Sequence, residues 1–131
     1  MITRELYQYL KQDAKLAALM GGEARLFPNI IHAGSEPPFI CYRSAGAAQD
    51  DCPLREETVA FDITAGDYAA AESIGNRLAE LFDPCAPARI ETQGWTLLHA
   101  RPAACADSAD ELGRHVKTVA FTFKFLKKGA L

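Results

Sequence analysis

The chain has 131 residues, 49% of them hydrophobic and 24% charged, with a formal net charge of -3. This balance is typical of one globular domain, and the small acidic excess argues against non-specific nucleic-acid binding, which requires clustered Lys and Arg. No apolar run approaches the ~20 residues that span a bilayer, and Met1 leads into no signal segment. We therefore expect a single domain over residues 1–131, made in the cytoplasm, with no membrane partner.

The first predicted element is a helix over residues 3–20, with Thr3 as its cap. Asp13 interrupts the apolar stripe of this helix on the solvent side. The stripe consists of Leu6, Tyr9, Leu10, Leu16, Leu19 and Met20. A glycine pair ends the helix, because glycine takes the left-handed conformation that helix C-termini favour, and residues 26–28 are expected to be a short extended piece.

A proline pair before residues 39–43 predicts an edge strand, where a missing N–H costs no ladder hydrogen bond. Residues 44–56 follow as a long polar loop. Loops of this length are usually functional or mobile, and we expect this one to be mobile and to close a long hairpin with the next strand. Asp50, Asp51 and Arg55 of this loop are candidate residues for contacts with other chains.

The central stretch of the chain changes from strand to helix periodicity. Val59, Phe61 and Ile63 alternate with small or polar residues over 57–64, the pattern of a strand with one buried face. Asp67 is placed to cap the helix that follows. The stripe of that helix consists of Tyr68, Ala71, Gly75, Leu78 and Phe82. This helix is expected to lie across the apolar face of the strand.

Two strands and a second long loop are expected after the central helix. The strands are predicted around residues 89–92 and over 95–101. Residues 102–114 are rich in alanine and aspartate and predict a loop that we again expect to be mobile. Arg101 and Arg114 flank this loop and are further candidates for contacts between chains.

The last predicted strand, residues 116–126, has the most regular alternation in the chain. One of its faces carries Val119, Phe121, Phe123 and Phe125. Strands in sequence with helices on one face predict an α+β domain. We expect a mostly antiparallel four- to five-stranded sheet with two helices packed on one face, in the order α-β-β-α-β-β. The helical stripes and the phenylalanine face would form the core.

The four cysteines are Cys41, Cys52, Cys85 and Cys105, and no two of them have C-x-x-C spacing. A chain of this length does not need disulfides to fold, so we expect free thiols, with Cys41 as a small buried hydrophobe. A zinc site built from the scattered cysteines is the less favoured interpretation.

No motif of known catalytic or nucleotide-binding mechanism is found in the sequence. The three histidines, His32, His99 and His115, are far apart in the chain, so a Cys–His pair would have to be assembled by the fold. Acidic residues in alanine-rich loops are more often solvating charges than catalysts. We expect neither enzymatic activity nor a cofactor or metal. The alternative is a small α+β enzyme or ligand-binding module with a Cys/His or carboxylate site.

The arrangement of these pieces resembles the small tail-completion and tail-terminator proteins of long-tailed bacteriophages, including those encoded by prophages. The resemblance covers most of the chain, and none of its residues performs chemistry. The matching pieces are the helix at 6–20, the segment RLFP at 25–28, the segment EPPFICY at 36–42, the strand at 58–64, the helix at 67–82 and the closing strand at 116–126.

This resemblance implies a subunit that assembles as a ring, typically a hexamer, on the end of the tail tube. The ring would stop tube growth and form the surface for joining the DNA-filled head. Its partners would be other copies of itself, the tail tube protein, the head–tail connector proteins and the DNA that passes through. The protein would be found in the host bacterial cytoplasm during assembly and then in the virion tail.

Physical features of the sequence agree with such a subunit. Ring subunits use head-to-tail contacts that close on rotation. Loops that are mobile in the free subunit can become ordered on docking, and an acidic balance suits a lumen through which DNA must pass without sticking.

Overall fold

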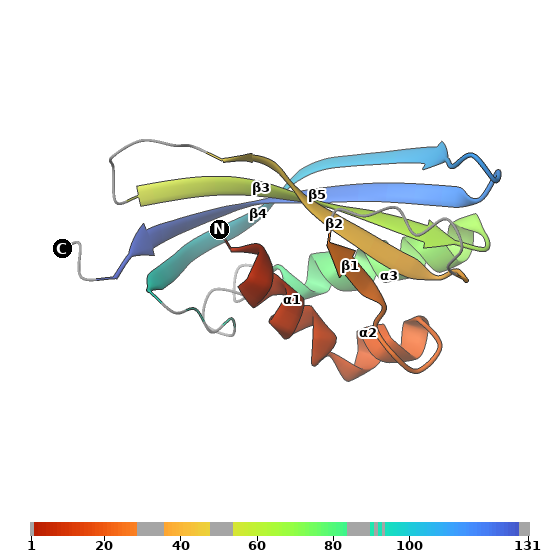
Figure 1. The fold of residues 1–131 in the computed structure, drawn as a ribbon, viewed down its shortest axis with the longest axis horizontal. Helices are drawn as coiled ribbons and strands as arrows, with labels where there is room; N and C mark the ends of the chain where they lie inside the picture. Colours follow the sequence, from red (N-terminus) through yellow and green to blue (C-terminus); the bar gives the residue numbers. More distant parts are fainter. Residues whose placement is uncertain are drawn as a thin grey trace.

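The computed structural model describes residues 2–28, 36–47, 54–83, 90, 92 and 94–128. Its elements are, in order, α1 (Thr3–Lys11), α2 (Ala14–Leu19), β1 (Leu26–Pro28), β2 (Phe39–Ala47), β3 (Leu54–Ala65), α3 (Tyr68–Leu81), β4 (Trp95–Ala109) and β5 (His115–Lys127). The helices lie on one side of a single sheet (Figure 1). The α+β class predicted from the sequence is confirmed, with three helices in the described part of the chain instead of two.

The sheet has five strands in the order β1-β2-β3-β5-β4. Strands β2, β3, β5 and β4 pair antiparallel with their neighbours, and the predicted hairpin between the second and third strands is confirmed. The short piece expected at 26–28 is also a strand, but it pairs parallel to β2. The sheet is therefore mixed and not purely antiparallel.

Strand β3 and helix α3 form the centre of the fold, as their periodicity predicts. Val59, Phe61 and Ile63 are all buried on the face that α3 covers. The Asp67 side chain accepts a hydrogen bond of 2.7 Å from the backbone N–H of Ala70, so the predicted helix cap is confirmed. Of the apolar stripe predicted for this helix, only Tyr68 is exposed, and the other residues are buried.

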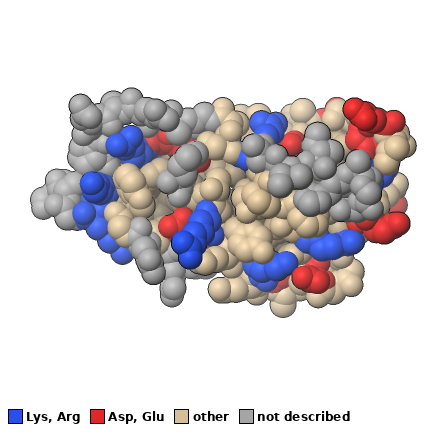
Figure 2. All heavy atoms as spheres, in the orientation of Figure 1, with Lys and Arg blue, Asp and Glu red and all other residues tan. Residues whose placement is uncertain are grey.

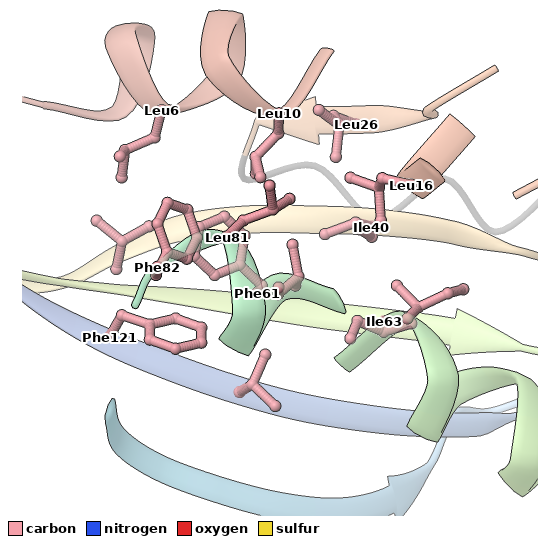
Figure 3. Close-up of a cluster of buried hydrophobic side chains, with 14 of the residues drawn as sticks. Leu6, Leu10, Leu16, Leu26, Ile40, Phe61, Ile63, Leu81, Phe82 and Phe121 are labelled. Carbon is pink, nitrogen blue, oxygen red and sulfur yellow. The ribbon is translucent and has the colours of Figure 1, made fainter. Parts of the chain in front are cut away.

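The core is built around aromatic side chains from three segments. Phe82, just after α3, stacks on Phe61 of β3 at 5.7 Å between ring centroids and meets Phe121 of β5 at 5.0 Å. Figure 3 shows Leu10 of α1 and Leu16 of α2 closing this cluster from the helical side. Burying such side chains contributes about 1.5–3 kcal/mol each, the main drive for folding.

Residues 3–20 form two helices and not the single helix predicted. The chain breaks at Asp13, whose carboxylate accepts a hydrogen bond of 2.8 Å from the backbone N–H of Leu16 and so caps α2. The same carboxylate accepts two hydrogen bonds from Arg77 of α3, at 2.7 and 2.9 Å. Asp13 is thus not on the solvent side, since its side chain is 14% exposed. It joins two helices that are distant in sequence.

The start of the first helix also differs from expectation. Thr3 does not cap α1, whose N-cap residue is Ile2 with no side-chain cap of its own. Instead, the backbone N–H of Ile2 donates a hydrogen bond of 3.0 Å to the buried carboxylate of Glu57 on β3. A carboxylate at a helix N-terminus is stabilised by the helix dipole, so this contact ties α1 to the sheet.

The prediction of a long loop at 102–114 is wrong. Strand β4 continues to Ala109, and only residues 110–114 form the turn to β5. The loop predicted at 44–56 is also shorter than expected, because both flanking strands extend into it. Residues 48–53 lie outside the described residues. So do Arg89 and Glu91 of the strand expected at 89–92, and the described residues of that segment form no strand.

Replacing Phe61 by alanine should lower the free energy of unfolding by about 3–5 kcal/mol, because a cavity would open beside the rings of Phe82 and Phe121. Urea denaturation of the variant measures this loss. Leu112→Ala is the control, since that side chain is 66% exposed and its truncation should cost little. Equal stability of Phe61→Ala and the wild type would show that the core is assigned wrongly.

Replacing Asp13 by asparagine should lower the free energy of unfolding by about 1–3 kcal/mol at neutral pH, because a charged hydrogen-bond pair is lost. The hydrogen bonds from Arg77 lower the pKa of Asp13 against the opposing effect of burial. A lowered pKa stabilises the fold above about pH 4, the ordinary range of aspartate, and this contribution disappears as the pH falls through the lowered pKa.

Denaturation at pH 7 and near pH 3 would measure this effect. The difference between Asp13→Asn and wild type should shrink at the lower pH. Glu80→Gln serves as the control, because Glu80 lies 3.8 Å from the same Arg77 but is 56% exposed and such surface pairs contribute little. A difference that does not change with pH would contradict the assigned role of the Asp13 charge.

Candidate functional site

The most exposed regular part of the fold is the second half of β4, residues 101–109, here called the β4 overhang. Every residue of this segment is exposed, whereas most of the β5 residues opposite it are buried. β4 is the last strand of the sheet, so the described residues place no strand on its far side. The overhang is therefore open on both faces and along one edge.

Alternation along β4 shows that the helices do not reach this segment. Cys105 and Asp107 face the helical side, like their β5 register partners Val119 and Lys117. Both partners are buried, but Cys105 and Asp107 are exposed. The helices thus cover β5 on this face of the sheet, but they do not cover residues 101–109 of β4.

Two features of β4 limit how another strand could pair with it. The register shifts between Leu97 and His99, and again between Pro102 and Ala104. Bulges and proline are common protections of edge strands against uncontrolled pairing. Beyond the second shift, residues 104–109 pair with β5 in regular register, which leaves one regular open stretch of edge.

The turn between β4 and β5 is fixed by Asp110. Its carboxylate accepts hydrogen bonds from the backbone N–H groups of Leu112 (3.0 Å) and Arg114 (2.8 Å) and from Nε of Arg114 (2.6 Å). Loss of hydration opposes the charge of Asp110, but the hydrogen bonds from Arg114 outweigh it, and the pKa of Asp110 is lowered. Gly113 adopts a φ of 77°, which glycine allows. This ordered turn presents Leu112 to solvent.

A cluster of polar side chains lies where the overhang leaves the helical layer. Lys117 of β5 has a side chain only 11% exposed, and its ammonium lies 3.7 Å from the Asp107 carboxylate and 5.8 Å from the centre of the Tyr68 ring. Burial disfavours the charge, but interactions with Cys105 and Asp107 outweigh it, and the pKa of Lys117 is raised. The aliphatic part of Lys117 packs on α3 where Gly75 leaves room, since a Cβ there would lie 3.2 Å from it.

This cluster corrects one prediction and adds a residue that sequence reasoning missed. Tyr68, expected in the helical stripe, is 51% exposed and covers His115, with 5.2 Å between the ring centroids. Lys117 was not predicted as a cluster residue, although the alternation of the last strand places it on the core-facing side. A lysine at such a position is a usable signal, because lysine is almost never buried unless paired.

The three predicted interface residues that the structure describes do not lie together in one site. Arg101 is 53% exposed and pairs with Glu56 at 2.8 Å near one end of the sheet. Arg114 lies at the other end, where its side chain is 18% exposed, bound to Asp110 and stacked 5.5 Å from the Phe39 ring. Arg55 is half-buried on β3. Asp50 and Asp51 lie outside the described residues. Arg114 therefore supports the turn within the subunit.

The structure brings together only some of the residues that the alternative Cys/His site would use. His115 Nε2 lies 3.0 Å from Asp107 Oδ1 in the same cluster as Cys105. His99 lies opposite Lys124, towards the other end of the hairpin, and His32 is outside the described residues. Cys105 is a free thiol, and Cys41 is half-buried. Within the described ranges no three His, Cys, Asp or Glu side chains could hold a metal ion.

The two ends of the sheet differ in charge. Three exposed lysines, Lys124, Lys127 and Lys128, lie at the end where β5 finishes. Acidic side chains from the β4–β5 hairpin, Asp107 and Glu111, lie at the opposite end. In Figure 2 blue side chains gather at the left-hand end and the largest red groups lie at the right-hand end.

Comparison with known proteins identifies the fold. No family model matches the chain, and no curated protein matches it. One similar solved structure is a chain from "Virion of native gene transfer agent (GTA) particle", with 15% identity and a TM-score of 0.69, covering 92% of this chain and 91% of that chain. This likeness establishes a shared fold. Among the described residues, no helix has the length and apolar character needed to cross a membrane.

Replacing Asp110 by alanine should loosen the β4–β5 turn, because the turn loses the acceptor of three hydrogen bonds. Backbone amides of residues 110–114 should then exchange faster with deuterated water than in the wild type. Glu111→Ala is the matched control, since Glu111 is the exposed neighbour of Asp110 in the same turn. Identical exchange in the two variants would show that Asp110 does not hold the turn.

Proposed function

We propose that this chain is a structural protein of a phage-like virion and, more specifically, a tail terminator. Such a subunit caps the end of the tail tube as a ring, stops its growth and forms the surface for head joining. The observation that carries the proposal is the shared fold with a gene transfer agent virion chain over 92% of this chain and 91% of that one. The sequence resemblance to tail-terminator proteins supports the finer assignment.

The surface of the sheet suits a ring subunit. A ring requires two different, complementary surfaces on each copy, which close when repeated by rotation. The open sheet offers two unlike edges, β4 on one side and β1 with β2 on the other. Its lysine-rich and acidic ends would then lie on opposite faces of the ring, one towards the tail tube and the other towards the head.

The partners of this function are further copies of the chain, as a hexamer, together with the tail tube protein and the head–tail connector proteins. DNA would contact the ring only during passage through its lumen. The net charge of -3 suits such a passage, because it gives phosphates no strong site to bind. The protein would act in the host bacterial cytoplasm during assembly and remain in the virion tail.

The assembly role is preferred to the enzyme or ligand-binding alternative because of where the polar cluster lies. A ligand site is normally a concave pocket that buries most of its ligand. Cys105 is exposed and the Asp107 side chain is 41% exposed, and the Asp107 carboxylate already contacts the Lys117 ammonium and the His115 ring. This arrangement anchors a strand more readily than it binds a substrate.

Electron microscopy of particles from the producing strain with the gene deleted tests the proposal. Without the terminator, tail tubes should exceed their normal length and heads should remain unjoined, while a plasmid copy of the wild-type gene should restore joined particles of normal length. Tubes of normal length joined to heads in the deletion strain would contradict the proposed function.

A further inference from the structure

We propose that residues 104–109 of β4 pair edge to edge with residues 43–47 of β2 in a second copy of this chain. Neighbouring sheets would then be continuous around the ring. The inference rests on the proposed function, because it assumes that copies of the chain assemble. It assigns the contact that joins them.

One partner in this pairing is the β4 overhang. Its outer-face residues Ala104, Ala106 and Ser108 are exposed, as are the residues between them that face the helical side. A strand edge of this kind presents unpaired backbone groups and is a template for another strand. Pro102 and the bulge beside it confine regular pairing to residues 104–109.

The other partner is the far edge of β2. Strand β1 covers β2 only from Ile40 to Tyr42. Beyond Tyr42, the described residues place β3 on one side of β2 and no strand on the other. Arg43, Ser44 and Ala45 are exposed there. The open stretch of β2 is therefore similar in length to the open stretch of β4, and its register with β3 shifts between Ser44 and Gly46.

The directions of the strands match. β4 is antiparallel to β5, and β5 is antiparallel to β3, so β4 and β3 run in the same direction. β2 runs opposite to both of them. When rotation carries one sheet beside the next without inverting it, β4 of one copy meets β2 of its neighbour antiparallel. Antiparallel pairing is slightly more stable per residue than parallel pairing.

A second copy of this chain is favoured over an unrelated strand as the partner, because copies of the chain can supply a pairing strand for both the β4 edge and the β2 edge. Each copy uses one β4 stretch and one β2 stretch, so repetition by rotation pairs both stretches in every copy. Close approach is permitted by the small exposed side chains of Ser44 and Ala45 on β2 and of Ala104, Ala106 and Ser108 on β4.

The test is Ala106→Lys, because lysine on an edge strand opposes pairing with another strand. Ala106 is exposed, so the isolated subunit should keep its fold, which circular dichroism and thermal unfolding would verify. Ser108→Lys is a second variant on the same face. The matched control is Ala79→Lys, an exposed alanine of α3 on the opposite side of the sheet.

Assembly is followed by co-sedimentation with purified tail tubes over a concentration series and by hydrogen exchange of the assembled ring. Wild-type and Ala79→Lys proteins should assemble, and their amides at 104–109 should become protected relative to the free subunit. Ala106→Lys should weaken assembly about tenfold or more, equivalent to about 1.4 kcal/mol, with the overhang amides still exchanging.

Two results would overturn the inference in distinguishable ways. If Ala106→Lys and Ser108→Lys assemble as well as the wild type and Ala79→Lys, the β4 edge is not the contact between copies. The proposed function would still stand in that case. If the wild-type chain never associates, either with itself or on tubes, both the inference and the proposed function fail.

Discussion

The fold depends on β5, which pairs with β3 on one side and with β4 on the other over almost its whole length. Its core-facing side chains, among them Phe121 and Phe123, pack against Phe82 beyond α3. The same strand therefore builds the core and supports a neighbour that the helices do not cover. Because the β5 ladder holds β4 in place, the overhang can be ordered without a hydrophobic face of its own.

This dependence explains which elements could be predicted from the sequence. β3, α3 and β5 carry clear periodicity in residues such as Phe61, Leu78 and Phe123, and their types and approximate limits are confirmed. The overhang could not be recognised, because alanine, aspartate and proline have low strand propensity and the segment is a strand only through its pairing with β5. Tertiary pairing overrode local preference there.

Side-chain roles were predicted less well than elements. The break at Asp13 is a local helix cap, but the hydrogen bonds between Asp13 and Arg77 join residues 64 positions apart in sequence, and no local pattern shows them. Arg114 binds Asp110 in the turn, and its role in contacts between chains stays a prediction. Lys117 is the exception, because a lysine in a regular core-facing alternation is a signal readable from sequence.

An edge strand left open is a liability for a soluble subunit and an advantage for a ring. Pro102, the two bulges in β4 and the exposed charges of the overhang each reduce uncontrolled pairing. The regular stretch that remains is short, so association through it would be weak for one isolated pair of subunits. A closed ring, or a tail tube that gathers several copies, would make such a contact stable.

The central claim is that copies of this chain form a ring on the end of a tail tube. The most direct measurement is mass in solution by light scattering coupled to size exclusion, first over a concentration series and then with purified tail tubes. We expect either a hexamer or a monomer that associates only when tubes are present. A stable monomer or dimer that ignores tubes would contradict the claim.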